Sequence, residues 1–373
     1  MFKRKTTFIL GAGASWHYGY PTGEELVQKA VETARDICRA YYAETDEAGK
    51  TPSPFVETYP QHYRSQEQFD SFIRHLRLFE AKVNEANPLV IDDFLGHNKD
   101  IADVGKLLIA MVLLECESDA SSRPAKKRER EERALCGDWI RYVVQQLTVD
   151  CDKPSDLLDN EVYFVTFNYD LSLETGLYWK LANYNWFNNG GFCDDFLSQG
   201  RIQHVYGQLY GFDVKHPSTP TGTYNNARFP LADKIDRAYD AAQNIRTISP
   251  DEKSASAEIL TVIKEAEYLY FLGYGFDRRN NRLLQLNSGI GVSGAQHIFF
   301  TNYGNKNKVS KTVESIYVPQ QNAHDLNGLP LGSLLGENYQ KRSMPHLRGT
   351  KFDVEKSTKS VYDALADDFD WPE

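Results

Sequence analysis

The sequence predicts an α/β fold, a Rossmann-like and mostly parallel sheet with a large helical insertion. Short apolar runs recur along the chain, and each stops abruptly at small or polar residues: TTFILGAGAS (6–15), VYFVTFNYD (162–170), EYLYFLGYGFD (267–277) and QHIFFTN (296–302). Buried strands of parallel sheets have this continuous apolar character, and their carboxyl ends meet at one edge, where such folds bind ligands. We therefore expect the polar residues that end the four runs to converge.

The first run enters a glycine turn, Gly-Ala-Gly-Ala-Ser. Such a turn brings backbone N–H groups close to a ligand, and Gly11 and Gly13 offer the φ freedom or the close approach that a phosphate site needs. The usual dinucleotide fingerprint, G-x-G-x-x-G with an acidic residue about 20 positions on, is not met, because Trp16 stands at the third glycine position. A structural turn explains a lone G-x-G equally well, so the other segments decide.

Helical patterns dominate the region between the first and second runs. Thr22 with Glu25 forms a capping box, and a second box, Ser65 with Gln68, precedes an apolar stripe at helical spacing. The stripe consists of Phe69, Phe72, Ile73, Leu76 and Phe79. Further helices are predicted around 107–114 and 135–147. We expect a first Rossmann-like part over 1–45, a helical insertion over 46–155, a second Rossmann-like part over 156–350, and a C-terminal acidic tail over 351–373.

Composition limits the class of protein. With 373 residues the chain can bury a sizeable core, and its net charge of -10 argues against nonspecific duplex binding. The strongest charge run, 119–133, fits a solvated loop or a local nucleic-acid or partner surface. The longest apolar run, 107–114, is far shorter than the roughly 20 residues of a membrane span. Because the polar start MFKRKTT leads directly into the first strand, we expect no signal peptide and a cytoplasmic protein.

Taken in order, these segments resemble the sirtuin-like NAD-consuming proteins. GAGAS followed by Gly19-Tyr20-Pro21 is similar to their phosphate loop, TFNYD (166–170) to their Asn/Asp strand end, and GYGF (273–276) to a later glycine turn. Asn302 falls where the family has a residue that contacts the adenosine ribose. The resemblance implies that NAD is bound by Gly11, Ala12, Gly13, Ser15, Pro21, Thr22, Tyr206, Gly273, Gly275 and Asn302.

The cysteines narrow the branch of this family. Deacylating sirtuins carry a zinc ribbon, which needs two C-x-x-C pairs around the metal. The five cysteines here are scattered singly, at positions 38, 116, 136, 151 and 193. We expect no zinc and no other metal. The chain resembles the zinc-free branch of bacterial anti-phage defence, the HerA-associated type, and IDDFL (91–95) is similar to a feature of that branch.

Three residues are candidates for the chemistry of N-glycosidic cleavage, which develops oxocarbenium character on the ribose. Asn168 can orient a water or a ribose hydroxyl without adding a negative charge. Asp170 can bind a ribose hydroxyl or stabilise the cationic transition state, or it can cap the helix that follows. QHVYG (203–207) resembles the family's His-Gly strand end, and His204 is the expected base, although Tyr206 directly precedes Gly207. A strand would direct His204 and Tyr206 to one side of the sheet.

The resemblance implies an NAD glycohydrolase, a hydrolase that depletes cellular NAD as an antiviral abortive-infection effector. It also implies a homo-oligomer in complex with a HerA-like ATPase. Three other classes stay open: an NAD-dependent protein deacylase, a noncatalytic NAD or ADP-ribose binding module, and a nuclease subunit of a defence complex.

Overall fold

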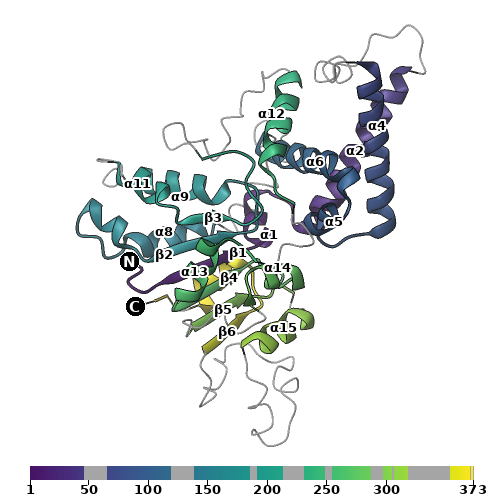
Figure 1. Ribbon diagram of the computed structural model, residues 1–373. Coiled ribbons are helices and arrows are strands. Elements are labelled where there is room, and N and C mark those ends of the chain that lie inside the picture. Colours follow the sequence, from purple (N-terminus) through teal and green to yellow (C-terminus); the bar gives the residue numbers. More distant parts are fainter. Residues whose placement is uncertain are drawn as a thin grey trace, which may run out of the picture.

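A computed structural model describes residues 1–45, 65–118, 138–184, 191–212, 231–247, 254–286, 297–304, 306–317, 353–369 and 371–372 (Figure 1). The charge run at 119–133 and Cys136 lie outside these residues. Six parallel strands form one sheet in the order β3-β2-β1-β4-β5-β6. The strands are β1 (Thr6–Leu10), β2 (Val162–Thr166), β3 (Ile202–His204), β4 (Tyr268–Leu272), β5 (His297–Thr301) and β6 (Asp353–Ser357). The predicted α/β fold with a parallel sheet and a helical insertion is confirmed.

Helices make up most of the remaining described chain. Those before β2 are α1 (Ala12–Ser15), η1 (Trp16–Tyr18), α2 (Gly23–Thr45), α4 (Gln66–Ala86), α5 (Ile91–His97), α6 (Lys99–Ser118), α8 (Ile140–Thr148) and η3 (Pro154–Asp159). Those after β2 are α9 (Ser172–Asn183), α11 (Phe192–Ser198), α12 (Leu231–Asn244), α13 (Ala257–Glu265), α14 (Arg278–Leu283), α15 (Asn307–Tyr317), α16 (Val361–Asp363) and the π-helical turn η8 (Ala364–Asp368). None of the described helices could cross a bilayer as an apolar span.

Alternation along the strands builds a core on each face of the sheet. On one face, Phe8 stacks on Phe164 at 5.2 Å and on Tyr270 at 4.9 Å, since these residues are register partners on neighbouring strands. Helices α8, α9 and α11 cover this face. Ile9 points to the opposite face, whose core it shares with α13, α15 and the helices of the insertion. Burial on both faces explains why these strands are continuous apolar runs.

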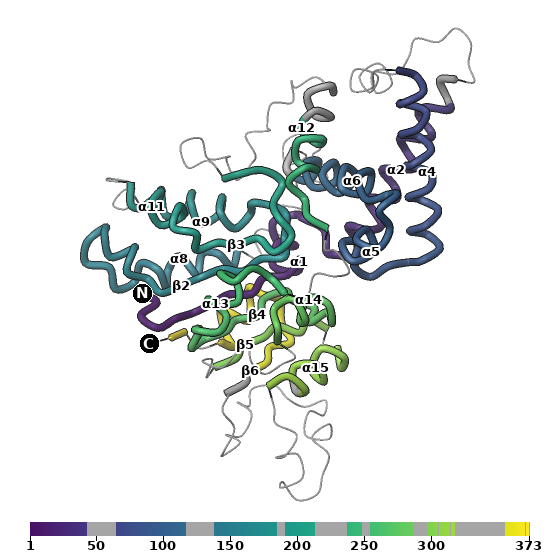
Figure 2. The backbone as a smooth tube through the Cα atoms, viewed as in Figure 1, coloured from purple at the N-terminus to yellow at the C-terminus, as the bar shows by residue number. Residues whose placement is uncertain are grey.

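Five helices on that second face form a body that we call the helical module: α2, α4, α5, α6 and α12. Helix α2 packs against α4 and α6, and α12 packs against α6. Figure 2 shows α2 and α4 side by side, extending away from the sheet. Both predicted helix starts are confirmed, because Thr22 N donates to Glu25 Oε2 at 2.7 Å and Gln68 N donates to Ser65 Oγ at 3.3 Å. Although α2 lies within 1–45, the helices that it contacts most are α4 and α6 of the insertion.

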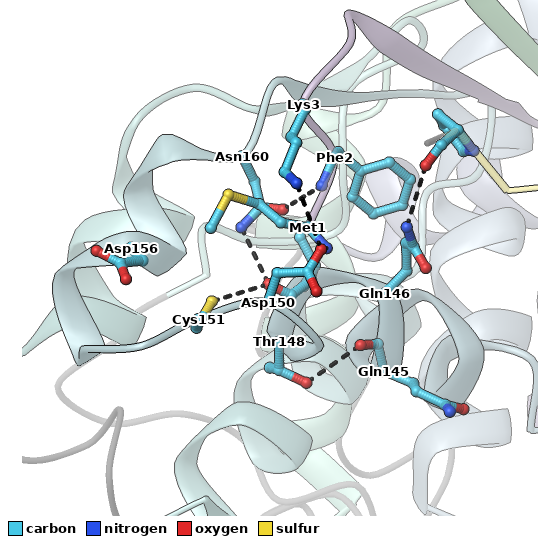
Figure 3. A network of polar contacts seen from close by, with 12 residues as sticks. Met1, Phe2, Lys3, Gln145, Gln146, Thr148, Asp150, Cys151, Asp156 and Asn160 are labelled. Carbon is cyan, nitrogen blue, oxygen red and sulfur yellow. Dashed lines mark hydrogen bonds and ion pairs between the residues drawn. The ribbon is translucent and has the colours of Figure 1, made fainter.

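The segment expected to be an acidic tail is part of the sheet. β6 pairs with β5, and the helical turns that follow bury Val361 and Leu365. The two ends of the chain meet at the amino edge, where the rings of Phe2 and Trp371 lie 5.9 Å apart. Figure 3 shows the polar contacts there: Phe2 N donates to the side chain of Asn160 at 2.7 Å. Because β6 is an edge strand with the polar sequence DVEKS, its pattern gave no apolar signal.

Candidate functional site

The glycine turn after β1 packs against the glycine turn after β4. Gly11 N donates to Leu272 O at 3.0 Å, and Gly13 N donates to Gly273 O at 3.2 Å. A Cβ on Gly11 would lie 2.4 Å from Gly273 O. The glycine turn thus makes a close approach to the backbone of Gly273, and its approach to a ligand stays a prediction. Gly11 does not use the φ freedom of glycine, since its φ of -106° and ψ of 179° are extended; Gly273, with φ of +60°, has the left-handed conformation that favours glycine.

Asn168 lies directly beside the first turn. Its amide nitrogen Nδ2 donates to Gly11 O at 3.2 Å and to Ser15 Oγ at 2.6 Å. A backbone carbonyl only accepts hydrogen bonds, so the contact with Gly11 fixes which end of the amide is nitrogen. The amide oxygen Oδ1 makes no hydrogen bond with any residue that the structure describes. Asn168 therefore holds the glycine turn with its nitrogen, and its oxygen has no partner in the part of the chain that the structure describes.

Ser15 links Asn168 to Asp170. The Ser15 hydroxyl donates to Asp170 Oδ1 at 3.2 Å, and the same oxygen accepts Ser172 N at 3.0 Å, at the first residue of α9. Asp170 thus accepts the first backbone N–H of α9, although the N-cap residue is Leu171, whose side chain makes no capping hydrogen bond. Burial raises the pKa of Asp170. The carbonyl of Ala14 accepts Trp139 Nε1 at 2.8 Å, which fixes the other side of the turn.

His204, the last residue of β3, uses both ring nitrogens inside the protein. Nε2 contacts Glu174 Oε1 at 2.6 Å, and Nδ1 contacts Asn168 O at 2.8 Å. Burial alone would lower the pKa of His204, but the Glu174 carboxylate and the Asn168 carbonyl outweigh it, so the pKa is raised. An imidazolium that donates at both nitrogens fits these contacts. The other oxygen of Glu174, Oε2, is buried without a hydrogen bond in the described structure.

Tyr206 lies in the core on the face of Ile9, whereas His204 contacts Glu174 of α9 on the opposite face. The predicted common direction is wrong, because β3 ends at His204 and a turn follows, which breaks the alternation. The Tyr206 hydroxyl donates to Asn280 Oδ1 on α14, and its ring lies 5.3 Å from that of Phe167. Burial strongly raises the pKa of Tyr206, so its phenol keeps its proton.

On the β4–β5 side, the polar groups serve the fold. Gly273 N donates to Thr301 Oγ1 at 2.8 Å. Asn302 Nδ2 donates to Lys306 O at 3.0 Å and Ser310 Oγ at 3.1 Å, and its Oδ1 accepts Lys306 N at 2.9 Å. Both ends of the Asn302 amide thus hold the start of α15.

The remaining predicted contacts lie around the glycine turns. Ala12 is half-buried at the start of α1, Pro21 is buried, and Thr22 caps α2. Gly275 is exposed and has open space where a side chain would stand. Among the described residues, no group of three or more His, Cys, Asp or Glu side chains is arranged to hold a metal ion.

Two kinds of site residue were missed from the sequence. Glu174 partners His204 from the first turn of α9, and its only signal was an acidic residue in an otherwise apolar helix start. Asp92 and Asp93 of IDDFL reach Tyr169 and Arg279. IDDFL is visible as a motif, but its contacts join segments distant in the sequence. In comparisons with known proteins, no family model and no curated protein matches this chain.

Proposed function

We propose that this protein is an NAD glycohydrolase, which cleaves NAD to nicotinamide and ADP-ribose. The observation that supports this best is the series of hydrogen bonds from Gly11 through Asn168 and Ser15 to Asp170, which leaves Asn168 Oδ1 without a partner among the residues that the structure describes. These hydrogen bonds lie at the carboxyl edge of a parallel sheet, where open α/β folds bind their ligands. The sirtuin-like segments meet at the same edge, which supports NAD as the substrate.

In the proposed reaction, the bond between the ribose C1′ and the nicotinamide nitrogen breaks. Nicotinamide leaves with the bonding electron pair, the ribose gains oxocarbenium character, and a water adds to C1′ and releases a proton. Asn168 Oδ1 accepts a hydrogen bond from that water or from a ribose hydroxyl. Because the amide is neutral, it orients the nucleophile without a net charge. Asp170 acts through Ser15, which it holds against Asn168.

His204 has two proposed roles that make different predictions. Its contact with Asn168 O supports a positioning role for the Asn168 backbone. For His204 to be the base, as the resemblance implies, Nδ1 must leave that carbonyl and lose its proton. A base role predicts an acidic limb in the pH profile of kcat that disappears in His204→Gln, whereas a positioning role predicts a lower kcat with the same profile.

Nicotinamide release from NAD tests the proposal directly. We expect Asn168→Ala to lower kcat by about 100-fold or more, the size of effect of removing one transition-state contact. Asn183→Ala, an exposed asparagine at the end of α9, is the matched control and should retain wild-type turnover. Circular dichroism confirms that each purified variant is folded. Equal turnover in wild type and Asn168→Ala would refute the proposal.

We propose further that the protein is a homo-oligomeric anti-phage effector that works with a HerA-like ATPase. The support is the resemblance to the zinc-free defence branch. The measurement is light scattering of the purified protein and nicotinamide release with and without the ATPase. A monomer with full activity alone would contradict this part while leaving the glycohydrolase activity intact.

The contacts of His204 favour one alternative, a noncatalytic NAD or ADP-ribose binding module. Such a module needs no unbonded base, and both nitrogens of His204 are already bonded. Calorimetry separates the two functions: binding of NAD without nicotinamide release, with and without the ATPase, would favour the module.

A further inference from the structure

The helical module contacts the candidate site through two adjacent acidic residues in the first turn of α5. Asp92 Oδ1 accepts the hydroxyl of Tyr169, and Asp93 Oδ1 forms an ion pair with Arg279 Nε at 3.0 Å. Tyr169 stands between Asn168 and Asp170 in the sequence, and Arg279 is in the first turn of α14. Helix α5 thus reaches the segment after β2 and the segment after β4 at once.

The Asp92 contact is deeply buried. Asp92 is 7% exposed and Tyr169 4% exposed, and the neighbouring Ile91 and Leu95 are buried in the same core. A buried carboxyl is costly unless it is hydrogen-bonded, and an apolar side chain would pack here without that cost. The hydroxyl of Tyr169 supplies the required partner. The pair therefore specifies where Tyr169 sits, rather than simply filling the core.

Tyr169 in turn is tied to the residues of the site. Its backbone carbonyl accepts Leu209 N at 2.9 Å, and its ring centroid lies 6.2 Å from that of Tyr206. Asn168 on one side of it bonds Gly11 and Ser15, and Asp170 on the other bonds Ser15. A shift of Tyr169 would therefore move the two residues that the proposed reaction uses.

The second contact, between Asp93 and Arg279, reaches the start of α14. Arg279 N and Asn280 N donate to Asp277 Oδ1, which caps α14, and Asn280 accepts the hydroxyl of Tyr206. The ion pair of Asp93 joins α5 to this cap region through the Arg279 side chain. The helix that carries both acids packs against α6 and α2, and α2 follows the glycine turn after only seven residues, 16–22.

We propose that Asp92 and Asp93 are positioning residues of the site, through which the helical module holds Asn168 and its neighbours in their working arrangement. The expected effect on kcat rests on the proposed glycohydrolase function. IDDFL thus has a role that is separate from packing: the first acid fixes the Asn168 segment, and the second fixes the α14 segment. Neither acid contacts substrate.

The Asp92–Tyr169 contact is tested with Tyr169→Phe, which keeps the ring, and with Asp92→Ala. We expect each to lower kcat for nicotinamide release by about tenfold with less change in KM, and the double variant to be no worse than either single one, since one contact is lost. Asp92→Asn, which keeps an acceptor, should recover most of the loss. Tyr268→Phe and Asp103→Ala are matched controls, because neither the Tyr268 hydroxyl nor the exposed Asp103 makes a hydrogen bond or ion pair with another described residue.

The Asp93–Arg279 contact is tested by exchanging its charges. Asp93→Arg and Arg279→Asp should each lower kcat, and the combination of both should restore it. Losses that multiply in the Asp92/Tyr169 double variant, or a charge exchange that restores nothing, would overturn the proposal.

Hydrogen exchange of the backbone amides of 168–172 provides a measurement that does not depend on turnover. In NAD-free protein, Tyr169→Phe should speed exchange in this segment relative to Tyr268→Phe, without changing exchange in β6. If wild type releases no nicotinamide, the glycohydrolase proposal fails while this comparison still decides the positioning role. Unchanged exchange in 168–172 would overturn the inference even in an active enzyme.

Discussion

The two halves of the carboxyl edge have similar sequences but use their polar groups differently. On the β4–β5 side, both ends of the Asn302 amide form hydrogen bonds at the start of α15, and Asp277 caps α14. On the β1–β2 side, only the amide nitrogen of Asn168 forms hydrogen bonds, and its amide oxygen has no partner in the described structure. A polar residue at a strand end is therefore a ligand candidate only where the fold leaves one of its atoms unbonded.

The largest effect is expected where the two halves touch. In Gly273→Ala, the new Cβ would lie 2.2 Å from Ala14 N in a residue with φ of +60°, so both space and backbone conformation oppose it. We expect a loss of more than about 4 kcal/mol in the free energy of unfolding, measured by urea denaturation.

Gly275→Ala is the matched control for this change. Gly275 lies two residues away and has open space at its Cβ position, so its variant should stay within about 0.5 kcal/mol of wild type. Similar losses for the two variants would show that contact between the turns does not join the halves of the edge.

A pH-dependent effect is expected on the β1–β2 side, from Asp92. Burial raises its pKa from 3.8 to about 7, so the folded protein holds this proton more tightly than the unfolded chain. Stability is therefore lost as the pH rises from about 4 to about 7, and the penalty is complete above that. Asp92→Asn does not titrate, so it should gain about 2 to 4 kcal/mol over wild type between pH 4 and pH 8.

Thermal or urea unfolding across this pH range measures the difference. His204, whose raised pKa also gives stability that is lost at rising pH, is present in both proteins and cancels. The residues near Asp92, which are Asp93, Tyr169 and Tyr206, are also present in both wild type and Asp92→Asn. A constant gap between variant and wild type would mean that Asp92 does not titrate in this window.

The smallest effect separates the two asparagines. Asn302→Ala removes the hydrogen bonds that start α15, and we expect it to cost about 1 to 3 kcal/mol of stability while kcat for nicotinamide release is kept. Asn168→Ala should instead reduce kcat strongly, by a much larger factor than Asn302→Ala does. If Asn302→Ala instead raises KM for NAD without loss of stability, the ribose contact implied by the resemblance is favoured over the structural role.

The sequence predicted much of the fold because its signals are local. Apolar runs located β1, β2, β4 and β5, and capping residues located the starts of α2 and α4. The sequence of β6 carries no such signal, because an edge strand needs no continuous apolar run. The sequence also indicated Gly11, Ser15, Asn168 and Asp170 as neighbours, since the carboxyl ends of parallel strands share an edge.

Which atoms of those residues remain available was decided only by tertiary structure. The pairing of His204 with Glu174, the turn that sends Tyr206 to the other face, and the reach of Asp92 to Tyr169 all join segments far apart in the chain. Periodicity and capping report how a residue relates to its neighbours within a few positions. Hydrogen-bond partners of buried polar atoms depend instead on how separate elements pack, because each such atom bonds to whichever group the fold brings within about 3 Å.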